Sequence, residues 1–312
     1  SLNVCFIGIG SIARRHIKNL KTICNAYGIK LNIDAVRRSF KKKLGDEGLS
    51  FRKVYTKCEE LDMEYDVIFI TNPTEYHIKT LIETMEYGKN FFIEKPISSV
   101  SRIKEAEAIQ FKKKAVYYVA CPLRYNAVIL YLKNNVDFQK VISVRSISSS
   151  YLPEWRPGKD YRETYSASKE LGGGVSVDLI HEWDYLTFLM GMPRKVFYMG
   201  GKKSTLEIDS DDYAVYIAEY SDKIVELHLD YFGRKTIRQI MIFTDDDTIC
   251  GDLVNNRIEF MKTGKIIDFM EERDDYQIRE LVHFLEMIEG KTESDNDIAH
   301  AINVLKLAQG KV

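Results

Sequence analysis

The stretch NVCFIGIGSIA at residues 3–13 decides the fold. Its first half is a continuous apolar run, which is typical of a strand buried on both faces of a sheet. Its second half, GIGSIA at 8–13, carries a GxGxxA pattern where the strand passes into a helix. In that context Gly8 makes a tight turn, Gly10 lets the backbone approach a pyrophosphate, and Ala13 lets the helix pack closely on the strand. The sequence therefore predicts a dinucleotide site at Gly8, Gly10, Ser11, Ile12 and Ala13, with a plain strand-to-helix turn as the alternative.

Strand-like and helix-like patterns alternate over the first part of the chain. DVIFIT at 66–71, for example, precedes a helical pattern at 77–87. Such alternation predicts parallel strands with crossover helices. From residue 195 to 269 the strands instead show a period of two, which is typical of an antiparallel sheet with one wet face. We expect an α/β protein with a doubly wound Rossmann domain at 1–121 and an α+β domain at 122–312.

Bulk composition excludes several classes of partner. The 312 residues contain 45 Lys+Arg and 46 Asp+Glu, so no basic field favours nucleic acid or an anionic membrane. The five cysteines are scattered without a CxxC pair, which argues against a disulfide framework and a structural zinc site. No apolar run approaches the length of a membrane span. We expect a soluble cytoplasmic protein with no metal site, no signal peptide and no anchor.

The end of the second strand bears on the choice of coenzyme. DAVRRSF at 34–40 places Asp34 inside the strand, too early to bind a ribose 2′-hydroxyl. At the tip stand Arg37, Arg38 and Ser39, whose guanidinium and hydroxyl groups suit a 2′-phosphate. We therefore favour NADP over NAD. The alternative is a basic loop that faces water.

Two more strand tips face the same edge of the sheet. Ligands bind at the carboxyl ends of the strands in an open α/β sheet, where TNPTEYH at 71–77 and EKP at 94–96 both lie. Lys95 there could donate a hydrogen bond to the oxygen of a carbinol or carbonyl, and Pro96 restricts the backbone beside it. The alternative is a lysine that pairs only with Glu94 or with solvent. His16 lies on the same side and either contacts a ligand or fills the core. From these loops we predict coenzyme contacts at Thr71, Asn72, Pro73, His77, Glu94 and Lys95.

These motifs together resemble one family. GIGSIARRH at 8–16, TNPTEYH, EKPIS at 94–98 and GGGVSVDLIHEWDYL at 172–186 occur in the order found in the Gfo/Idh/MocA oxidoreductases. The resemblance implies a Rossmann domain followed by a domain with a large open antiparallel sheet, often used to form dimers or tetramers. It also implies that Lys95 is the catalytic lysine, usually before a cis peptide, and that His181 is the catalytic histidine.

The spacing within the downstream motif departs from the family. In many members the aspartate precedes the histidine by four positions, whereas Asp178 precedes His181 by three. On one helix both spacings put the pair on the same face, so Asp178 could still orient the imidazole or touch substrate. Asp184 is the other candidate for the orienting contact. The predicted chemistry is hydride transfer at a sugar, nucleotide-sugar or cyclitol carbinol, with His181 as the base and Lys95 stabilising alkoxide character.

Substrate specificity is expected from the segment YLPEWRPGKDYRETYSA at 151–167. Aromatic faces and forked donors suit a sugar, and the excess of cations suits a carboxylate or a nucleotide diphosphate. An ordered loop that packs on the sheet or on a neighbouring subunit is the alternative. The predicted substrate contacts are Arg124, Trp155, Arg156, Tyr161, Tyr165, Asp178 and His181.

Two other functions remain open at this stage. The family includes dinucleotide-binding sensors that act through protein contacts, and relatives that hydrolyse glycosides with a recycled nicotinamide. Retention of both Lys95 and His181 favours an enzyme, because a sensor needs the cradle but not the base.

Overall fold

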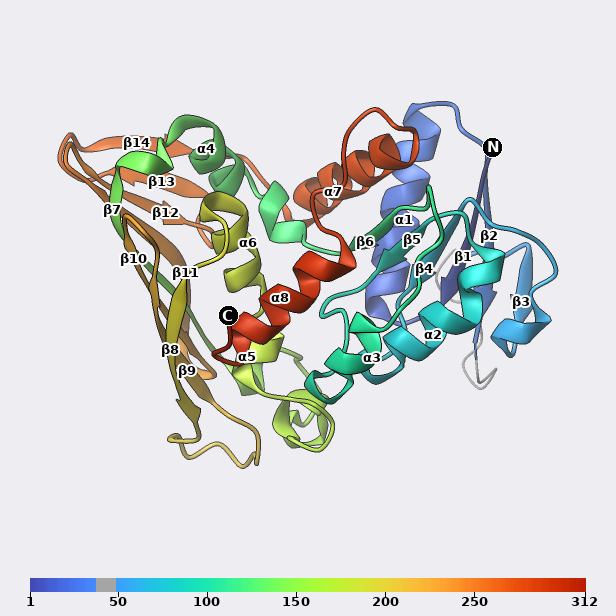
Figure 1. Ribbon diagram of the computed structural model, residues 1–312, viewed down its shortest axis with the longest axis horizontal. Helices are drawn as coiled ribbons and strands as arrows, with labels where there is room; N and C mark the ends of the chain where they lie inside the picture. The colour runs from blue at the N-terminus through green and yellow to red at the C-terminus, as the bar shows by residue number, and fades with distance from the viewer. Residues whose placement is uncertain (38–48) are drawn as a thin grey trace. The chain divides into compact units, whose positions relative to one another are not determined.

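The computed structural model describes residues 1–37 and 49–312, which form two compact units (Figure 1). Unit 1 comprises residues 1–120 and 273–302, and unit 2 comprises 121–272 and 303–312. The division after residue 120 lies beside the expected boundary. The expected C-terminal domain is corrected in one respect, because 273–302 returns to unit 1. The cause is apolar packing, since the ring of Phe284 lies 5.2 Å from that of Phe92 in the parallel sheet.

Unit 1 is a doubly wound sheet with the strand order β3-β2-β1-β4-β5-β6, and every neighbouring pair is parallel. Figure 1 shows helices on both of its faces, with α1 and α7 on one and α2 and α3 on the other. The strands are β1 (Leu2–Ile7), β2 (Leu31–Val36), β3 (Lys53–Tyr55), β4 (Val67–Ile70), β5 (Phe91–Ile93) and β6 (Tyr117–Val119). The helices are α1 (Ser11–Ala26), α2 (His77–Thr84), α3 (Ile103–Glu107) and α7 (Arg273–Ile288), and α8 (Ile298–Ala308) passes from unit 1 into unit 2.

The apolar runs that predict these strands are buried as expected. All four residues of β4 are fully buried, because both faces of the sheet are covered by helices. Phe69 at the centre stacks on Phe6 of β1, with ring centroids 4.5 Å apart. The carboxyl ends of β1, β2 and β4 are thereby held in register at one edge of the sheet.

Unit 2 is built on an eight-stranded sheet with the order β14-β13-β12-β11-β7-β10-β9-β8. Its pairs are antiparallel except β7 with β10, so the sheet is mainly antiparallel as predicted. The strands are β7 (Val141–Tyr151), β8 (Lys195–Gly201), β9 (Tyr213–Glu219), β10 (Ile224–Asp230), β11 (Phe232–Thr244), β12 (Thr248–Asp252), β13 (Arg257–Phe260) and β14 (Lys265–Asp268). The helices are α4 (Ala127–Asn135), α5 (Val175–Asp178) and α6 (His181–Met190).

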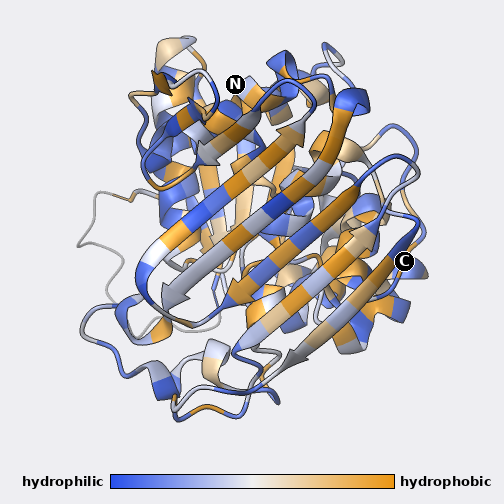
Figure 2. Ribbon diagram, turned by 90° about the vertical axis from the view of Figure 1, so that its left-hand side faces the viewer, coloured by the Kyte–Doolittle hydropathy of each residue, from blue (hydrophilic) through white to orange (hydrophobic). Residues whose placement is uncertain are grey.

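The two faces of this sheet differ. Figure 1 shows α4, α5 and α6 on one face, while no helix of the described chain covers the other. Figure 2 looks onto the bare face, on which hydrophobic and hydrophilic bands alternate along the strands. The side chains of Phe197, Met199 and Ile217 are 54%, 61% and 45% exposed there. The expected period of two is therefore present, but the wet face is partly apolar.

One predicted helix is in fact two. The sequence pattern predicts a single helical block around residues 175–190, but α5 ends at Asp178 and α6 begins at His181. Leu179 breaks the helix, because its ψ of 29° lies outside the helical range. The argument that Asp178 and His181 share one helical face is therefore wrong for this chain.

Candidate functional site

The glycine turn of unit 1 has the geometry that its sequence predicts. Gly8 adopts a φ of +93°, and a Cβ there would lie 2.8 Å from the Cα of Asn72. Gly10 is the N-cap residue of α1, and a Cβ on it would meet no atom within 4 Å. No side chain caps the first turn of α1, so its N–H groups and the helix dipole can receive an anion. The turn thus leaves open space directly over a helix N-terminus.

A cavity of about 720 Å³ opens at the same edge of the unit 1 sheet. Gly8 and Val36 contribute to its wall from the ends of β1 and β2, and Asn72 and Pro73 contribute from the loop after β4. A cavity of this size at the carboxyl ends of parallel strands suits a bound nucleotide. Four predicted coenzyme residues, Gly8, Arg37, Asn72 and Pro73, therefore line one cavity.

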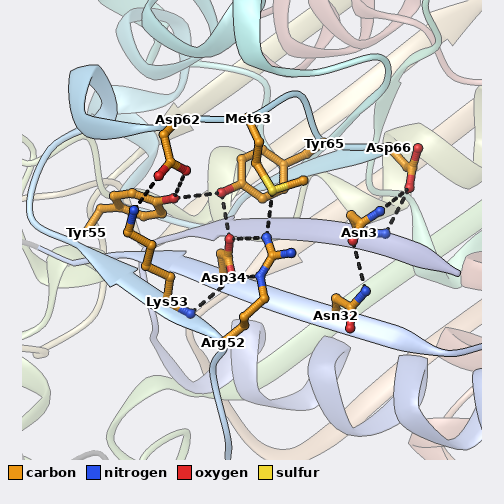
Figure 3. A network of polar contacts seen from close by, with 10 residues as sticks. All are labelled: Asn3, Asn32, Asp34, Arg52, Lys53, Tyr55, Asp62, Met63, Tyr65 and Asp66. Carbon is orange, nitrogen blue, oxygen red and sulfur yellow. Dashed lines mark hydrogen bonds and ion pairs between the residues drawn. The ribbon is translucent and has the colours of Figure 1, made fainter.

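The acidic residue of β2 is committed to the protein itself (Figure 3). Asp34 is 1% exposed and accepts two hydrogen bonds from the guanidinium of Arg52, at 3.0 and 2.6 Å. It accepts a third from the hydroxyl of Tyr65 at 2.8 Å, and burial together with hydrogen bonding to Tyr55 and Asp34 raises the pKa of that phenol. A carboxylate satisfied in this way is unable to bind a ribose hydroxyl as well.

Arg37 follows β2 directly and lines the cavity. Its Nη1 atom is buried and has no hydrogen-bond partner among the described residues. A buried guanidinium nitrogen without a partner is unfavourable, so an acceptor from a ligand would stabilise it. Arg38 and Ser39 lie outside the described residues.

Two histidines in unit 1 hold the loops in place. The imidazole of His77 lies with Nδ1 2.9 Å from the carbonyl oxygen of Pro96 and Nε2 2.9 Å from that of Asn72. Burial lowers the pKa of His77, although the carbonyl contacts oppose this. His77 and His16 are each 1% exposed, so both belong to the interior. His77 therefore ties the loop after β4 to the loop after β5, and its contact with a ligand stays a prediction.

The loop after β5 carries the predicted lysine. The peptide between Lys95 and Pro96 is cis, as the family resemblance implies. Oε1 of Glu94 lies 2.6 Å from Nε2 of His16, and Oε2 accepts a 3.3 Å hydrogen bond from the backbone N–H of Lys95. Burial would raise the pKa of Glu94, but His16 and Lys95 outweigh it and keep the pKa below its usual value. Glu94 is thus an ionised anchor for the backbone of Lys95, which is itself half-buried.

In unit 2 Asp178 is held by a residue that the sequence analysis missed. The hydroxyl of Tyr231, which directly follows β10, donates a 2.5 Å hydrogen bond to Oδ2 of Asp178. Burial, followed by the charge of Asp178, raises the pKa of this phenol, so it remains a donor. Asp178 is 5% exposed. No local signal in the sequence pairs these two residues, because they lie 53 positions apart.

Tyr165 of the segment at 151–167 lies beside Asp178. Burial and the charge of Asp178 raise the pKa of Tyr165, while the cation of Arg156 opposes the shift. The guanidinium of Arg156 lies 5.5 Å from the centre of the Tyr165 ring. Gly173 makes this approach possible, because a Cβ on it would lie 2.1 Å from the carbonyl oxygen of Tyr165. The glycine run therefore positions the segment that we expect to set specificity.

Other predicted substrate residues have partners within unit 2. Arg124 is 1% exposed and donates two hydrogen bonds to Asp184, at 2.9 and 2.8 Å. This pair favours a structural role for Arg124, and it occupies the carboxylate of Asp184, the second candidate for orienting His181. The hydroxyl of Tyr161 accepts the backbone N–H of Glu207 at 3.1 Å. Substrate contact by Arg124 and Tyr161 stays a prediction.

A buried ion pair next to His181 was also missed. Glu182 is fully buried on α6, and its Oε1 lies 2.9 Å from Nη2 of Arg238 on β11. Tyr185, one turn further, bonds Ser146 of β7 through its hydroxyl at 2.8 Å. These contacts fix the first turn of α6 to the sheet, and with it the backbone of His181.

Family models match both units. The model of the oxidoreductase family with an NAD-binding Rossmann fold matches residues 2–121, and that of the GFO/IDH/MocA C-terminal domain matches 130–249. This chain belongs to the Gfo/Idh/MocA oxidoreductase family. The resemblance drawn from the motif order is thereby confirmed, and so is the predicted fold class. In the described residues, no helix is long and apolar enough to cross a membrane.

Relatives of this family member include two curated inositol dehydrogenases. The inositol 2-dehydrogenase of Salmonella paratyphi B is 24% identical over 61% of this chain and 55% of its own length. The chain thus matches about half of that relative. The scyllo-inositol 2-dehydrogenase (NAD(+)) of Bacillus subtilis is 24% identical over 96% of this chain and 90% of its own length.

A solved structure extends the likeness of the fold. The UDP-N-acetylglucosamine 3-dehydrogenase of Acidithiobacillus ferrooxidans aligns with a TM-score of 0.78 at 20% identity, covering 99% of this chain and 95% of that one. At this level of identity the likeness establishes the fold and leaves the substrate open.

Proposed function

We propose that this protein is an NAD(P)-dependent dehydrogenase that moves a hydride between a nicotinamide coenzyme and the carbinol carbon of a sugar, nucleotide sugar or cyclitol. The observation that carries the proposal is the cavity of about 720 Å³ that Gly8 of the glycine turn lines, in a chain whose two units both match oxidoreductase models. The open space over Gly10 fits a pyrophosphate, and the strand ends around it fit a nucleotide. The dehydrogenase names of the relatives point to the same reaction class.

The proposed roles of the chain's own residues follow from their chemistry. A bound nicotinamide supplies the hydride acceptor. His181, which is half-buried, takes the proton of the substrate hydroxyl through its imidazole. The ammonium of Lys95 donates a hydrogen bond to the same oxygen as negative charge develops there. The carbinol thus loses one hydride to the nicotinamide and one proton to His181 and becomes a carbonyl, and return of both the hydride and the proton regenerates the alcohol in the reverse direction.

Asp178 is proposed to act with His181, either on substrate or on the imidazole. Its carboxylate accepts a hydrogen bond from Tyr231 and interacts with Tyr165, so it is held in place beside the segment that we expect to contact substrate. Glu94 and His77 are proposed as positioning residues, since they hold the loop that carries Lys95.

NADP is the proposed coenzyme. Arg37 lines the cavity and its buried Nη1 has no hydrogen-bond partner among the described residues, and Asp34 is occupied by Arg52 and Tyr65. A guanidinium contact with a 2′-phosphate is a charge-assisted hydrogen bond worth about 1.5–3 kcal/mol. The Arg37→Met variant should therefore bind NADPH at least tenfold more weakly and NADH almost unchanged, as measured by fluorescence titration. Equal losses for both coenzymes would contradict the preference.

A screen of sugars with the preferred coenzyme tests the function itself. Oxidised product with stoichiometric reduced coenzyme supports the dehydrogenase. Hydrolysis of a glycoside without net reduction of coenzyme would support the glycosidase alternative. Coenzyme binding without turnover of any sugar would favour a sensor.

We also propose that a second copy of this chain covers the bare face of the unit 2 sheet. Phe197 of β8 pairs directly with Ile217 of β9, and Met199 follows two positions later, so one apolar patch spans two strands. Such contiguous exposed patches mark interaction surfaces. The Met199→Glu variant should shift the molar mass measured by light scattering from dimer or tetramer to monomer. The matched control is Met270→Glu, since Met270 is fully exposed outside the strands.

A further inference from the structure

We propose that His16 is a positioning residue, which connects the helix of the glycine turn to the loop of Lys95 through the carboxylate of Glu94. The proposal rests on the dehydrogenase function above and adds to it a residue that acts through another side chain. It concerns unit 1 alone, because every residue in the argument belongs to that unit.

His16 lies in the second turn of α1, the helix that the glycine turn opens. Its imidazole packs edge-on against the ring of Phe92 on β5, with ring centroids 5.1 Å apart. The ring of Phe69 on β4 lies 6.2 Å away. The side chain is therefore fixed between α1 and the strand that leads into the loop of Lys95.

The polar capacity of this imidazole is directed to Glu94. Nε2 lies 2.6 Å from Oε1 of Glu94, which is 78 positions further along the chain. Burial would raise the pKa of Glu94, but the hydrogen bond with His16 and the neighbouring charges keep that pKa low, so the carboxylate is ionised and Nε2 donates. The other ring nitrogen, Nδ1, is buried and has no hydrogen-bond partner in residues 1–37 and 49–312.

A residue that only filled the core would serve better as an aliphatic one. Ile17 and Leu20 are such residues on α1, and both are buried. An imidazole buried with one nitrogen unpaired carries a desolvation cost that an aliphatic side chain avoids. We therefore assign the use of His16 to its hydrogen bond, which holds the carboxylate of Glu94 in one place.

Glu94 carries this restraint to the lysine. Its Oε2 accepts the 3.3 Å hydrogen bond from the backbone N–H of Lys95, while Oε1 is held by His16. The backbone N–H of Glu94 donates to the carbonyl oxygen of Ile70 at 3.0 Å, which fixes the residue at the end of β5. The titratable groups that act on this carboxylate are His16, Lys95 and His77. Its negative charge in turn favours the ammonium form of Lys95.

One helix thereby bears on two parts of the proposed site. The N-terminus of α1 faces the open space over Gly10, and its second turn holds Glu94. An error of about 1 Å in the placement of a reacting group can lower the rate by about 10²-fold. Loss of the contact between His16 and Glu94 should therefore affect turnover more than coenzyme binding.

Variants at His16 separate positioning from packing. His16→Leu keeps a buried side chain of similar size but removes the donor. We expect it to lower kcat by about 10- to 100-fold, while the dissociation constant of NADPH stays within about threefold. His16→Gln supplies an N–H donor again and should recover most of the loss. The control is Asn19→Leu, because Asn19 is equally buried on α1 and its Nδ2 has no partner among the described residues. It should retain the kcat of the wild type.

The pH dependence of kcat gives a readout that packing alone would not move. Glu94→Gln keeps the size of the side chain but removes its negative charge, so the ammonium of Lys95 is favoured less. The fall in kcat on the alkaline side should consequently move to lower pH than in the wild type. If the alkaline limbs of the two proteins coincided, Glu94 would not act on Lys95 and the proposal would be refuted.

Hydrogen exchange measured by mass spectrometry tests the restraint without any turnover. Exchange of the backbone N–H groups at 94–97 should become faster in His16→Leu and stay unchanged in Asn19→Leu. If it becomes faster but the wild type oxidises no sugar, the dehydrogenase fails and the restraint by His16 stands. If the wild type is active and His16→Leu changes neither exchange nor kcat, the restraint is refuted and the dehydrogenase stands. In an active wild type, either change without the other also refutes the positioning role.

Discussion

Two glycine-rich turns shape the two half-sites, and they do so in opposite ways. At Gly10 of unit 1 an added Cβ would meet nothing within 4 Å, so the absent side chain leaves room for a ligand. At Gly173 of unit 2 an added Cβ would lie 2.1 Å from the carbonyl oxygen of Tyr165. The space that a side chain would take is therefore occupied by the protein's own segment at 151–167. Under the proposed function, the first glycine leaves space for a coenzyme that many proteins share. The second makes room for the segment that we expect to contact the substrate.

The difference extends to how each half-site is held together. Unit 1 presents backbone N–H groups, a glycine at positive φ, and two loops whose carbonyl oxygens are tied together by His77. Unit 2 presents side chains whose partners are far away in sequence, such as Asp178 with Tyr231. Backbone geometry at a turn suffices for a constant coenzyme, whereas a variable substrate calls for side chains that can be exchanged.

The largest expected effect comes from the reacting groups, one from each unit. The Lys95→Ala and His181→Ala variants should each lower kcat by about 10²- to 10⁴-fold, because each removes a group that we propose donates to or accepts from the reacting oxygen. Coenzyme affinity, measured by fluorescence titration, should stay within about threefold for His181→Ala. Lys113→Ala and His300→Ala serve as controls and should retain wild-type turnover. If only one of the two variants lowered kcat, the account in which each unit supplies a reacting group would be contradicted.

The next effect separates the two glycines. Gly173→Ala forces a clash with the backbone of Tyr165, and we expect it to lower the free energy of unfolding by about 1–3 kcal/mol. The same variant should raise KM for the sugar, since Tyr165 and Arg156 move with the segment. Thermal unfolding and steady-state kinetics measure the two outcomes.

Gly10→Ala should behave in the opposite manner. Its Cβ enters open space, so the free energy of unfolding without coenzyme should change by less than about 1 kcal/mol. Coenzyme affinity should fall by about tenfold or more, because the methyl group lies where the pyrophosphate approaches. An equal loss of stability in the two alanine variants, or unchanged coenzyme binding in Gly10→Ala, would break the comparison.

The smallest effect is a dependence of stability on pH in unit 1. Burial lowers the pKa of His77 below its usual value of about 6.5. The folded chain therefore binds fewer protons than the unfolded chain below that pH, so the contribution to stability is complete above about pH 6.5 and is lost as the pH falls through the lower folded value. The free energy of unfolding should change by at most about 1.4 kcal/mol per pH unit because of His77.

The His77→Gln variant isolates this contribution. It should be less stable overall, because it loses contacts with Asn72 and Pro96, but its stability should vary less with pH below about 6.5 than that of the wild type. Denaturant titrations at several pH values measure both quantities. If the free energy of unfolding varied with pH in the same way for the wild type and His77→Gln, the pKa of His77 would be the same in the folded and unfolded chains, and the prediction would be wrong.

The sequence carried most of the information about unit 1. The strand, glycine turn and helix at 3–26 are adjacent in the chain, so local pattern was sufficient to predict them. The tips of β4 and β5 followed from the rule that parallel strands end at one edge. The assignment of 273–302 to this unit was not predictable, because it depends on contacts between residues far apart in the sequence, such as Phe284 with Phe92.

For unit 2 the sequence predicted the mainly antiparallel sheet, but it did not predict which side chains contact one another around Asp178. The partner of Asp178 lies 53 residues away, and the pair of Arg124 with Asp184 spans 60. Neither partner could be read from the sequence, because a local pattern does not show which distant side chain a buried charge will meet. The break between α5 and α6 was missed for a related reason, since the apolar pattern continues through Leu179 and Ile180 while the backbone turns.

The central claim is hydride transfer that uses coenzyme bound in unit 1 and the acid–base group of unit 2. The most direct measurement is the near-ultraviolet absorbance of reduced nicotinamide when NADP⁺ and the sugar panel are added to the wild type and to His181→Ala. We predict stoichiometric formation of NADPH and oxidised sugar with the wild type, and a variant that binds NADP⁺ equally well but forms neither. Undiminished turnover in His181→Ala, or no binding of either coenzyme to the wild type, would contradict the account.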